Sequence, residues 1–195
     1  REGMNLINLG NALDRSHRPD EAITCFHQAA SIFSDLGDSV NLGAAYAGMG
    51  STHYKSGEYD LSLSMYRKAY RSSSPQSQPW LRWEYSFNLG RVFHALAQAD
   101  SARTYLARAI DGYASGHTGA ALAEALEVLA RVEKSTGNNA EAVDLFERAS
   151  AIKDTLLDNK TSQWVSELQM NYALGKKEQE LAMAHEMAAK RRVWW

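Results

Sequence analysis

The chain has 195 residues, of which 45% are hydrophobic and 23% charged, a composition ordinary for a folded soluble protein. Its net charge of −2 provides no basic field that would gather nucleic acid, so we expect no nucleic-acid contact by this segment. No apolar run approaches the roughly 18–20 residues that cross a bilayer, and the single cysteine, Cys25, excludes an internal disulfide and a multi-cysteine metal cluster.

A small residue recurs every 40 residues, at Gly10, Gly50, Gly90 and Ala130. Sixteen residues after each stands a large apolar residue: Phe26, Tyr66, Leu106 and Phe146. Small residues also stand twelve and nineteen positions after each, for example Ala22 and Ala29. A period of this length sustained over about 160 residues predicts a solenoid rather than a globular enzyme. Proline is confined to three positions, which favours an all-α fold.

Each unit is predicted to form two helices, called A and B. We expect the A helices to pack on the B helices through positions four and one before the small residue and three after it. These positions hold Leu6, Leu9, Leu13; Tyr46, Met49, His53; Ser86, Leu89, Phe93; and Leu126, Leu129, Glu133. The small residue at the centre of this face lets helix B approach closely, which outweighs the roughly 1 kcal/mol helix-propensity cost of glycine.

The turns follow the same register along the chain. Pro19 suits the first turn of a helix, and Gly57 and Gly137 stand just past helix ends, where a left-handed residue is favoured. Residues 72–79 are predicted to be a loop between repeats. A stretch containing Gly112, Gly116 and Gly119 around His117 is predicted to be a turn, because a phosphate-binding loop would need a preceding strand.

Three of the four units carry residues that resemble the tetratricopeptide repeat pattern. They are Leu9-Gly10, Ala22, Phe26 and Ala29; Met49-Gly50, Gly57, Tyr59, Tyr66 and Ala69; and Leu129-Ala130, Gly137, Ala142, Phe146 and Ala149. The 40-residue step exceeds the usual 34, as in the longer-repeat branch that includes kinesin light chain-like arrays. The resemblance implies a right-handed all-α solenoid of four hairpins over residues 1–152, at about 3–36, 43–76, 83–116 and 123–152. Residues 153–195 are predicted to follow as a C-terminal helical segment.

In a stacked array of this kind the A helices line a concave groove. Their groove face, three before and one and four after the small residue, begins with Ile7 and Ala47 in the first two repeats. Its candidate ligand-binding residues are Asn11, Asp14, Ser51, Tyr54, Phe87, Arg91, His94, Glu127, Arg131 and Lys134. We expect a peptide or protein ligand there, with the basic residues receiving an anion. Glu127 and Arg131 are equally consistent with a solvated i,i+4 pair.

The segment after residue 152 is predicted to contain one long helix, from about 161 to 190. Trp164, Leu168 and Tyr172 share a face and are expected to dock on the open end of the fourth repeat. Beyond them a heptad seam consists of Met170, Leu174, Leu181, Ala184 and Ala188, interrupted by Lys177. Two interpretations stay open: a solvated helix end, or a short coil that makes a homodimer.

This C-terminal segment is similar to the one that closes the repeat region of Bacteroidetes membrane sensors. The similarity lies in Lys153-Asp154-Thr155-Leu156, in residues 167–172 and in residues 176–180. It implies a sensory or regulatory input domain of a membrane-anchored histidine kinase or transcriptional regulator. The basic and aromatic residues 190–195 are typical of a bilayer edge, so we expect a membrane tether just after Trp195 and a periplasmic location. The alternative is a cytoplasmic scaffold or adaptor that joins protein partners.

Signals for catalysis are weak throughout. The chain has no phosphate-binding loop, no Gly-x-Ser-x-Gly and no His-Glu-x-x-His motif. Its six histidines lack metal-ligand spacing within a helix, and His53 and Cys25 are interpreted as packing residues. We therefore expect a non-enzymatic binding protein without catalytic residues, metal or cofactor.

Overall fold

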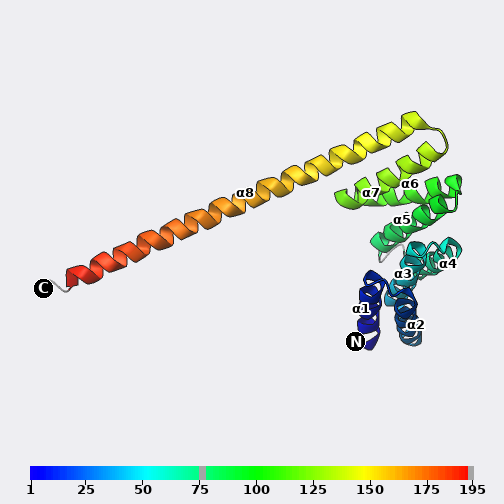
Figure 1. Cartoon of the computed structure of the whole chain (residues 1–195), viewed down its shortest axis with the longest axis horizontal. Helices are drawn as coiled ribbons and strands as arrows, with labels where there is room; N and C mark the ends of the chain where they lie inside the picture. The colour runs from blue at the N-terminus through cyan, green and yellow to red at the C-terminus, as the bar shows by residue number, and fades with distance from the viewer. Residues whose placement is uncertain (75–77, 193–195) are drawn as a thin grey trace. The chain divides into compact units, whose positions relative to one another are not determined.

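The structure is a computed structural model that describes the backbone of residues 1–74 and 78–192, and the side chains of residues 1–74, 78–158, 168–171 and 174–178. Within these ranges the chain is all helical. The helices are α1 (Glu2–Arg15), α2 (Pro19–Asp35), α3 (Ser39–Lys55), α4 (Tyr59–Ser72), α5 (Pro79–Ala95), α6 (Ala99–Ser115), α7 (Gly119–Ser135) and α8 (Asn139–Arg192). Figure 1 shows them in chain order.

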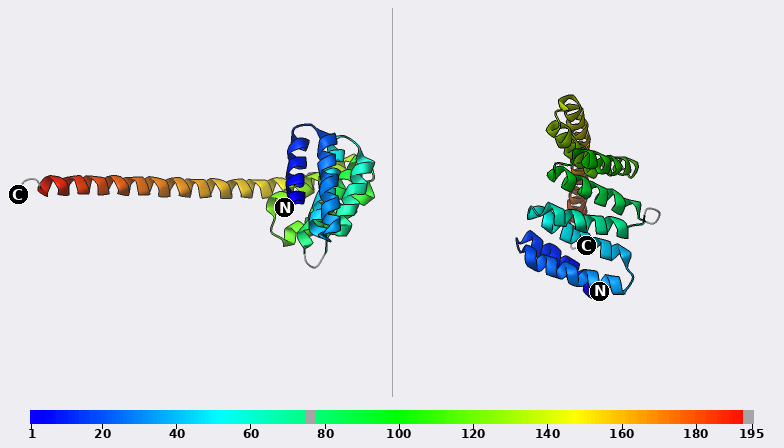
Figure 2. Two further views of the ribbon diagram at one scale, coloured as in Figure 1. Left: turned by 90° about the horizontal axis from the view of Figure 1, so that it is seen from below. Right: turned by 90° about the vertical axis from the view of Figure 1, so that its right-hand side faces the viewer.

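The chain divides into two compact units, Arg1–Ile152 and Lys153–Trp195. In the first unit each helix from α1 to α6 contacts the next one along the chain, and α1 also contacts α3, as α5 does α7. The views in Figure 2 show the same succession of hairpins. The A helices are therefore α1, α3, α5 and α7, and the B helices are α2, α4, α6 and the start of α8. The prediction of an all-α solenoid of four hairpins is confirmed.

The second unit belongs to the same helix as the last B helix. Sequence reasoning treated the helix over 161–190 as a separate element, whereas α8 runs from Asn139 to Arg192 without interruption. No glycine or proline stands between residues 139 and 174, so nothing in the sequence ends the helix there. Leu168, Met170 and Leu174 are exposed. The other side chains named for docking and for the heptad seam, Trp164, Tyr172, Leu181, Ala184 and Ala188, lie outside the described residues.

The small residue of each hairpin accommodates the large apolar residue sixteen positions later. A Cβ added at Gly10 would lie 2.8 Å from Phe26 Cε1, one at Gly50 2.9 Å from Tyr66 Cδ2, and one at Gly90 2.6 Å from Leu106 Cγ. Carbon atoms in favourable contact lie about 3.5–4.0 Å apart, so the missing methyl group is what lets helix B approach. The predicted close approach of A and B helices is confirmed in the first three repeats.

Two residues at predicted packing positions, one in the first repeat and one in the last, are exposed. Leu9 on α1 is 51% exposed, and Phe146 on the last B helix is 38% exposed. In the interior the same register holds Met49 and Leu89, which are fully buried. None of the three predicted packing positions of α1 is buried, whereas Leu126 in the fourth repeat is.

The turns share one backbone conformation. Gly57 and Gly137 have φ of 77° and 86°, as predicted, and His17, Ala97 and His117 adopt φ between 55° and 58° although they carry side chains. In each turn the next residue's N–H donates to the carbonyl five residues earlier, as Glu58 does to His53 at 2.9 Å. This is the Schellman pattern that closes a helix end. Pro19 begins α2 as expected, and α4 and α5 are joined across the predicted loop.

A buried ion pair connects α6 to the end of α7. Arg103 Nε donates to Glu133 Oε1 at 2.7 Å and its Nη2 donates to Oε2 at 3.1 Å, while Asn138 Nδ2 donates to Oε2 at 2.7 Å. The Glu133 side chain is only 8% exposed. These hydrogen bonds from Arg103, and then from Asn138, hold the pKa of Glu133 below its ordinary value. A carboxylate thus occupies a packing position because its charge is matched.

We predict that Gly90→Ala lowers the free energy of unfolding by about 1–3 kcal/mol through overpacking against Leu106, even though alanine is the better helix former. Adding Leu106→Ala should make the pair less destabilising than the sum of the single changes. Urea unfolding followed by circular dichroism measures both. Gly175→Ala is the control, because a Cβ there meets nothing within 4 Å. A stabilised Gly90→Ala protein would contradict the close contact.

We also predict a pH-dependent role for Glu133. Because its folded pKa lies below the ordinary 4.5, its contribution to stability is complete above that pH and is lost as pH falls through the folded value. The destabilisation caused by Glu133→Gln, measured by urea unfolding, should therefore be largest at neutral pH and shrink in acid. The exposed Glu147→Gln variant serves as the control. A difference between wild type and Glu133→Gln that is independent of pH would count against the bridge.

Candidate functional site

Two hollows of about 370 Å³ each open along the row of A helices. The first hollow is formed by α1, α3, α4 and α5, and the second by α3, α5 and α7. Residues lining the first hollow are Ile7, Asn11, Ala44, Ala47, Gly48, Ser51, Tyr66, Leu81, Glu84, Tyr85 and Asn88. Residues lining the second hollow are Tyr54, Arg91, His94, Glu124, Glu127, Val128 and Arg131. Arg91 Nη1 donates to Asn88 Oδ1 at 3.5 Å, so the two hollows adjoin.

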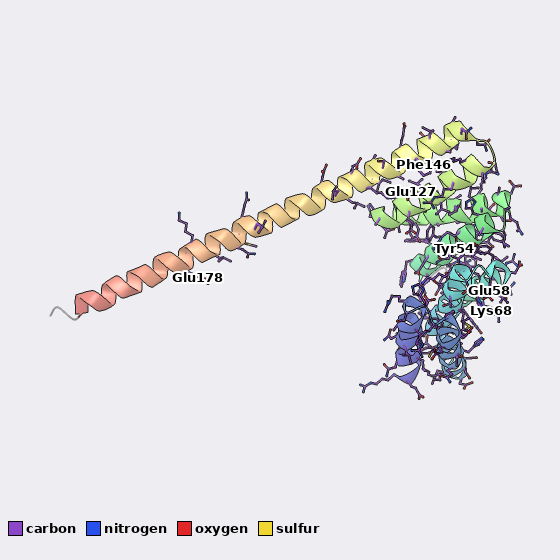
Figure 3. All side chains as sticks on the ribbon, viewed as in Figure 1. Tyr54, Glu58, Lys68, Glu127, Phe146 and Glu178 are labelled. Carbon is purple, nitrogen blue, oxygen red and sulfur yellow. The ribbon has the colours of Figure 1, made fainter. Side chains whose placement is uncertain are left out.

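The structure divides the ten predicted groove residues among these hollows. Asn11 and Ser51 line the first hollow. The larger group, Tyr54, Arg91, His94, Glu127 and Arg131, lines the second hollow. Figure 3 labels two of these residues, Tyr54 on α3 and Glu127 on α7. Seven of the ten residues are thus brought together in two adjacent sites.

The other three predicted residues lie elsewhere. Asp14 forms an ion pair with Lys55 and lines a separate hollow of about 550 Å³ near the ends of α1 and α3. Phe87 is 7% exposed, because its ring packs on Tyr113 at a centroid distance of 6.4 Å. Lys134 is exposed and lines neither hollow of the A-helix row. Asp14 is therefore paired and Phe87 belongs to the core.

Sequence reasoning missed several lining residues that belong to the same helical face. Two and six positions before the small residue stand Gly48 and Ala44 in the second repeat, Asn88 and Glu84 in the third, and Val128 and Glu124 in the fourth. These positions lie one or two helical turns before the predicted ones. Extending the groove face toward the start of each A helix would have found them. Tyr66, which comes from a B helix, had no such signal.

The first hollow is lined mainly by small and aromatic residues. Ala44, Ala47 and Gly48 leave space above α3, and Tyr66 and Tyr85 are almost fully buried. Burial raises the pKa of Tyr66 to about 12, opposed by a hydrogen bond with Ser51. The side chain of Glu84 stays partly exposed to solvent, but desolvation by its surroundings raises its pKa. Both phenols are therefore uncharged at neutral pH, and a carboxyl group lies beside them.

The second hollow is rich in charge. The Arg91 guanidinium lies over the ring of Tyr54 at 4.7 Å and near that of Phe87 at 5.6 Å, which are cation–π distances. Arg131 forms an ion pair with Glu127 at 3.7 Å, so the i,i+4 pair considered from the sequence is present. Desolvation, and then the charge of Arg131, lower the pKa of His94. The histidine therefore adds little positive charge at neutral pH.

Within the described residues none of the helices is both long and apolar enough to cross a membrane. The same residues contain no group of three or more histidine, cysteine, aspartate or glutamate side chains suited to hold a metal ion.

Comparison with solved structures shows the fold that the chain shares with other proteins. It resembles BtubC (BKLC) from P. vanneervenii, with 18% identity and a TM-score of 0.72 over 79% of this chain and 64% of that one. Aspartyl phosphate phosphatase F from Bacillus subtilis has 16% identity and a TM-score of 0.73, over 80% of this chain and 41% of that one. The apo form of RapI has 18% identity and a TM-score of 0.75, over 83% of this chain and 59% of that one. The chain therefore spans between 41% and 64% of these proteins.

Family comparison is more specific. A family model described as tetratricopeptide repeat matches residues 2–73 and 83–155, and a second with the same description matches residues 48–117. No curated protein sequence matches the chain. The family matches cover all four hairpins, and within them the first model leaves out only residues 74–82, which the second model includes. The chain therefore belongs to the tetratricopeptide repeat family and is a module for protein–protein interaction.

Proposed function

We propose that the two hollows bind an extended segment of a partner protein, and that the chain is the input domain of a membrane-anchored signalling protein. The observation that carries the binding site is the environment of Arg91. Its guanidinium is half-buried, and its contacts in the described part of the chain are aromatic rings and the Asn88 amide rather than carboxylates. Such a group is oriented and available for an anion.

The chemistry of Arg91 favours a carboxylate from the bound segment. A guanidinium donates two parallel hydrogen bonds to a carboxylate, and these bonds are stronger when the pair is partly desolvated. Tyr54 and Phe87 hold the guanidinium plane by stacking, so little rotamer entropy is lost on binding. Arg131 is a weaker candidate, since it is 54% exposed and already paired with Glu127.

The position of the second hollow supports a signalling role. Glu127 and Arg131 line it from α7, while another side of α7 packs on α8 through Leu126 and Leu145. A ligand that shifts α7 would act directly on the start of α8, which continues to Arg192. We propose that this helix carries the change to an output region, with the domain on the periplasmic side of the membrane. A static cytoplasmic adaptor would bind the same ligand without altering α8.

We predict that Arg91→Ala weakens peptide binding by about tenfold or more, the loss expected for a charge-assisted bidentate pair. The probes are peptides of twelve residues selected on the chain from a random displayed library and measured by fluorescence anisotropy. Arg67→Ala is the matched control, because Arg67 lies over the ring of Phe93 at 5.7 Å but lines neither hollow. A library without binders, or binders indifferent to Arg91→Ala, would overturn the proposed site.

The signalling role makes a separate prediction about α8. Binding of a selected peptide should change amide hydrogen exchange over residues 153–192, because the helix begins in the repeat that holds the ligand. The Arg91→Ala protein at the same peptide concentration is the control. Unchanged exchange at saturating peptide would reject the signalling proposal in favour of an adaptor. Recovery of the full-length protein only in the soluble fraction of its native cells would reject the membrane anchor.

A further inference from the structure

The first hollow has the opposite electrostatic character to the site around Arg91. Glu84 is the only charged side chain among the residues that line it. Desolvation raises the pKa of Glu84, and no cation or hydrogen bond within the described residues opposes that shift. Its charge also raises the pKa values of Tyr66 and Tyr85, after the larger effect of their burial. Glu84 is thus a partly desolvated carboxylate without a counter-ion in the described part of the chain.

The walls of this hollow suit the stem of a long basic side chain. Leu81 supplies partly exposed apolar surface, and the edges of the nearly buried Ile7, Tyr66 and Tyr85 side chains complete the apolar lining. Gly48 also lines the hollow, and on its other side it packs on Phe26, where an added Cβ would lie 2.5 Å from Cε1. A volume of about 370 Å³ equals on the order of ten water molecules. A whole lysine or arginine side chain therefore fits.

We propose that the first hollow binds a lysine or arginine side chain of the partner segment, with Glu84 as its counter-ion. This inference rests on the proposed peptide-binding function. It assigns the two adjacent hollows to opposite charges, a cation at Glu84 and an anion at Arg91. An apolar side chain in the hollow would offer Glu84 no counter-ion and would remove further water from its carboxylate.

The spacing of the two charges defines the ligand further. Glu84 and Arg91 both lie on α5, seven residues apart, and a helix rises 1.5 Å per residue, so they stand roughly 10 Å apart along its axis. An extended chain advances about 3.3 Å per residue. Side chains of an extended segment alternate between its two faces, so the bound segment should carry a basic and an acidic side chain two or four residues apart, on the same face. A single extended segment that lies along the axis of α5 reaches both Glu84 and Arg91.

The test uses the peptides selected for binding, resynthesised with capped termini and with each lysine replaced by norleucine or each arginine by citrulline. These replacements keep the length of the side chain and remove its charge. Replacement of the basic residue at one peptide position should weaken binding to the wild-type chain by about tenfold. That loss should disappear in Glu84→Gln, because the variant no longer holds a charge to pair. Glu84→Lys should instead favour peptides with an acidic residue at that position.

Glu124→Gln provides the matched control. Glu124 occupies the same register position in the next repeat but lines the second hollow, so its removal should leave the penalty for the neutral peptide intact. Selected peptides without a basic residue, or neutral peptides that bind wild type as well as charged ones do, would overturn the cation subsite. If Arg91→Ala still weakens binding of those peptides, the proposed peptide-binding function stands and only the cation subsite is rejected. If neither Arg91→Ala nor Glu84→Gln alters binding, both proposals fail.

Discussion

The structure depends on one contact, repeated along the array: a large apolar side chain of helix B seated on a glycine of helix A. Phe26 lies on Gly10, Tyr66 on Gly50 and Leu106 on Gly90, at separations that a methyl group would block. The B helices also contact the next repeat, as Phe26 does where it packs on Gly48 of α3. Tyr66 shows the link to function most directly, since it packs on Gly50 and also lines the first hollow. The same packing that builds the core thereby shapes the site.

The third repeat concentrates the chemistry of the binding face on one helix. Along α5, Glu84, Asn88 and Arg91 follow one another at helical spacing and line both hollows. Asn88 connects the two, because its side-chain oxygen accepts from Arg91 and its amide donates to the Glu84 backbone carbonyl at 3.1 Å. Opposite charges on one rigid helix set a fixed separation for whatever binds them. Specificity of this kind comes from complementary charges at fixed distances more than from buried area.

The sequence predicts the helices, the register and the glycine contacts well, because these follow from periodicity alone. It fails where a neighbour decides the outcome. Leu9 and Phe146 occupy packing positions but are exposed at the ends of the array, and Phe87 occupies a groove position but is covered by Tyr113. Residue type also gives no warning of the left-handed turns at Ala97 and His117, since tertiary closure of the hairpins imposes them. Glu84 was missed for a simpler reason: the groove face extends one helical turn further than the positions considered.

Those turns imply a smaller unit of construction than the hairpin. Left-handed residues recur every 20 positions among the described turns, at 17, 37, 57, 97, 117 and 137, and each is closed by the same hydrogen bond. Reversals inside a hairpin and between hairpins are therefore alike in backbone geometry. A gene duplication or loss of 40 residues that starts at any of these turns would rejoin matching chain ends. Array length is thus the property that can change during evolution with the least disturbance to local structure.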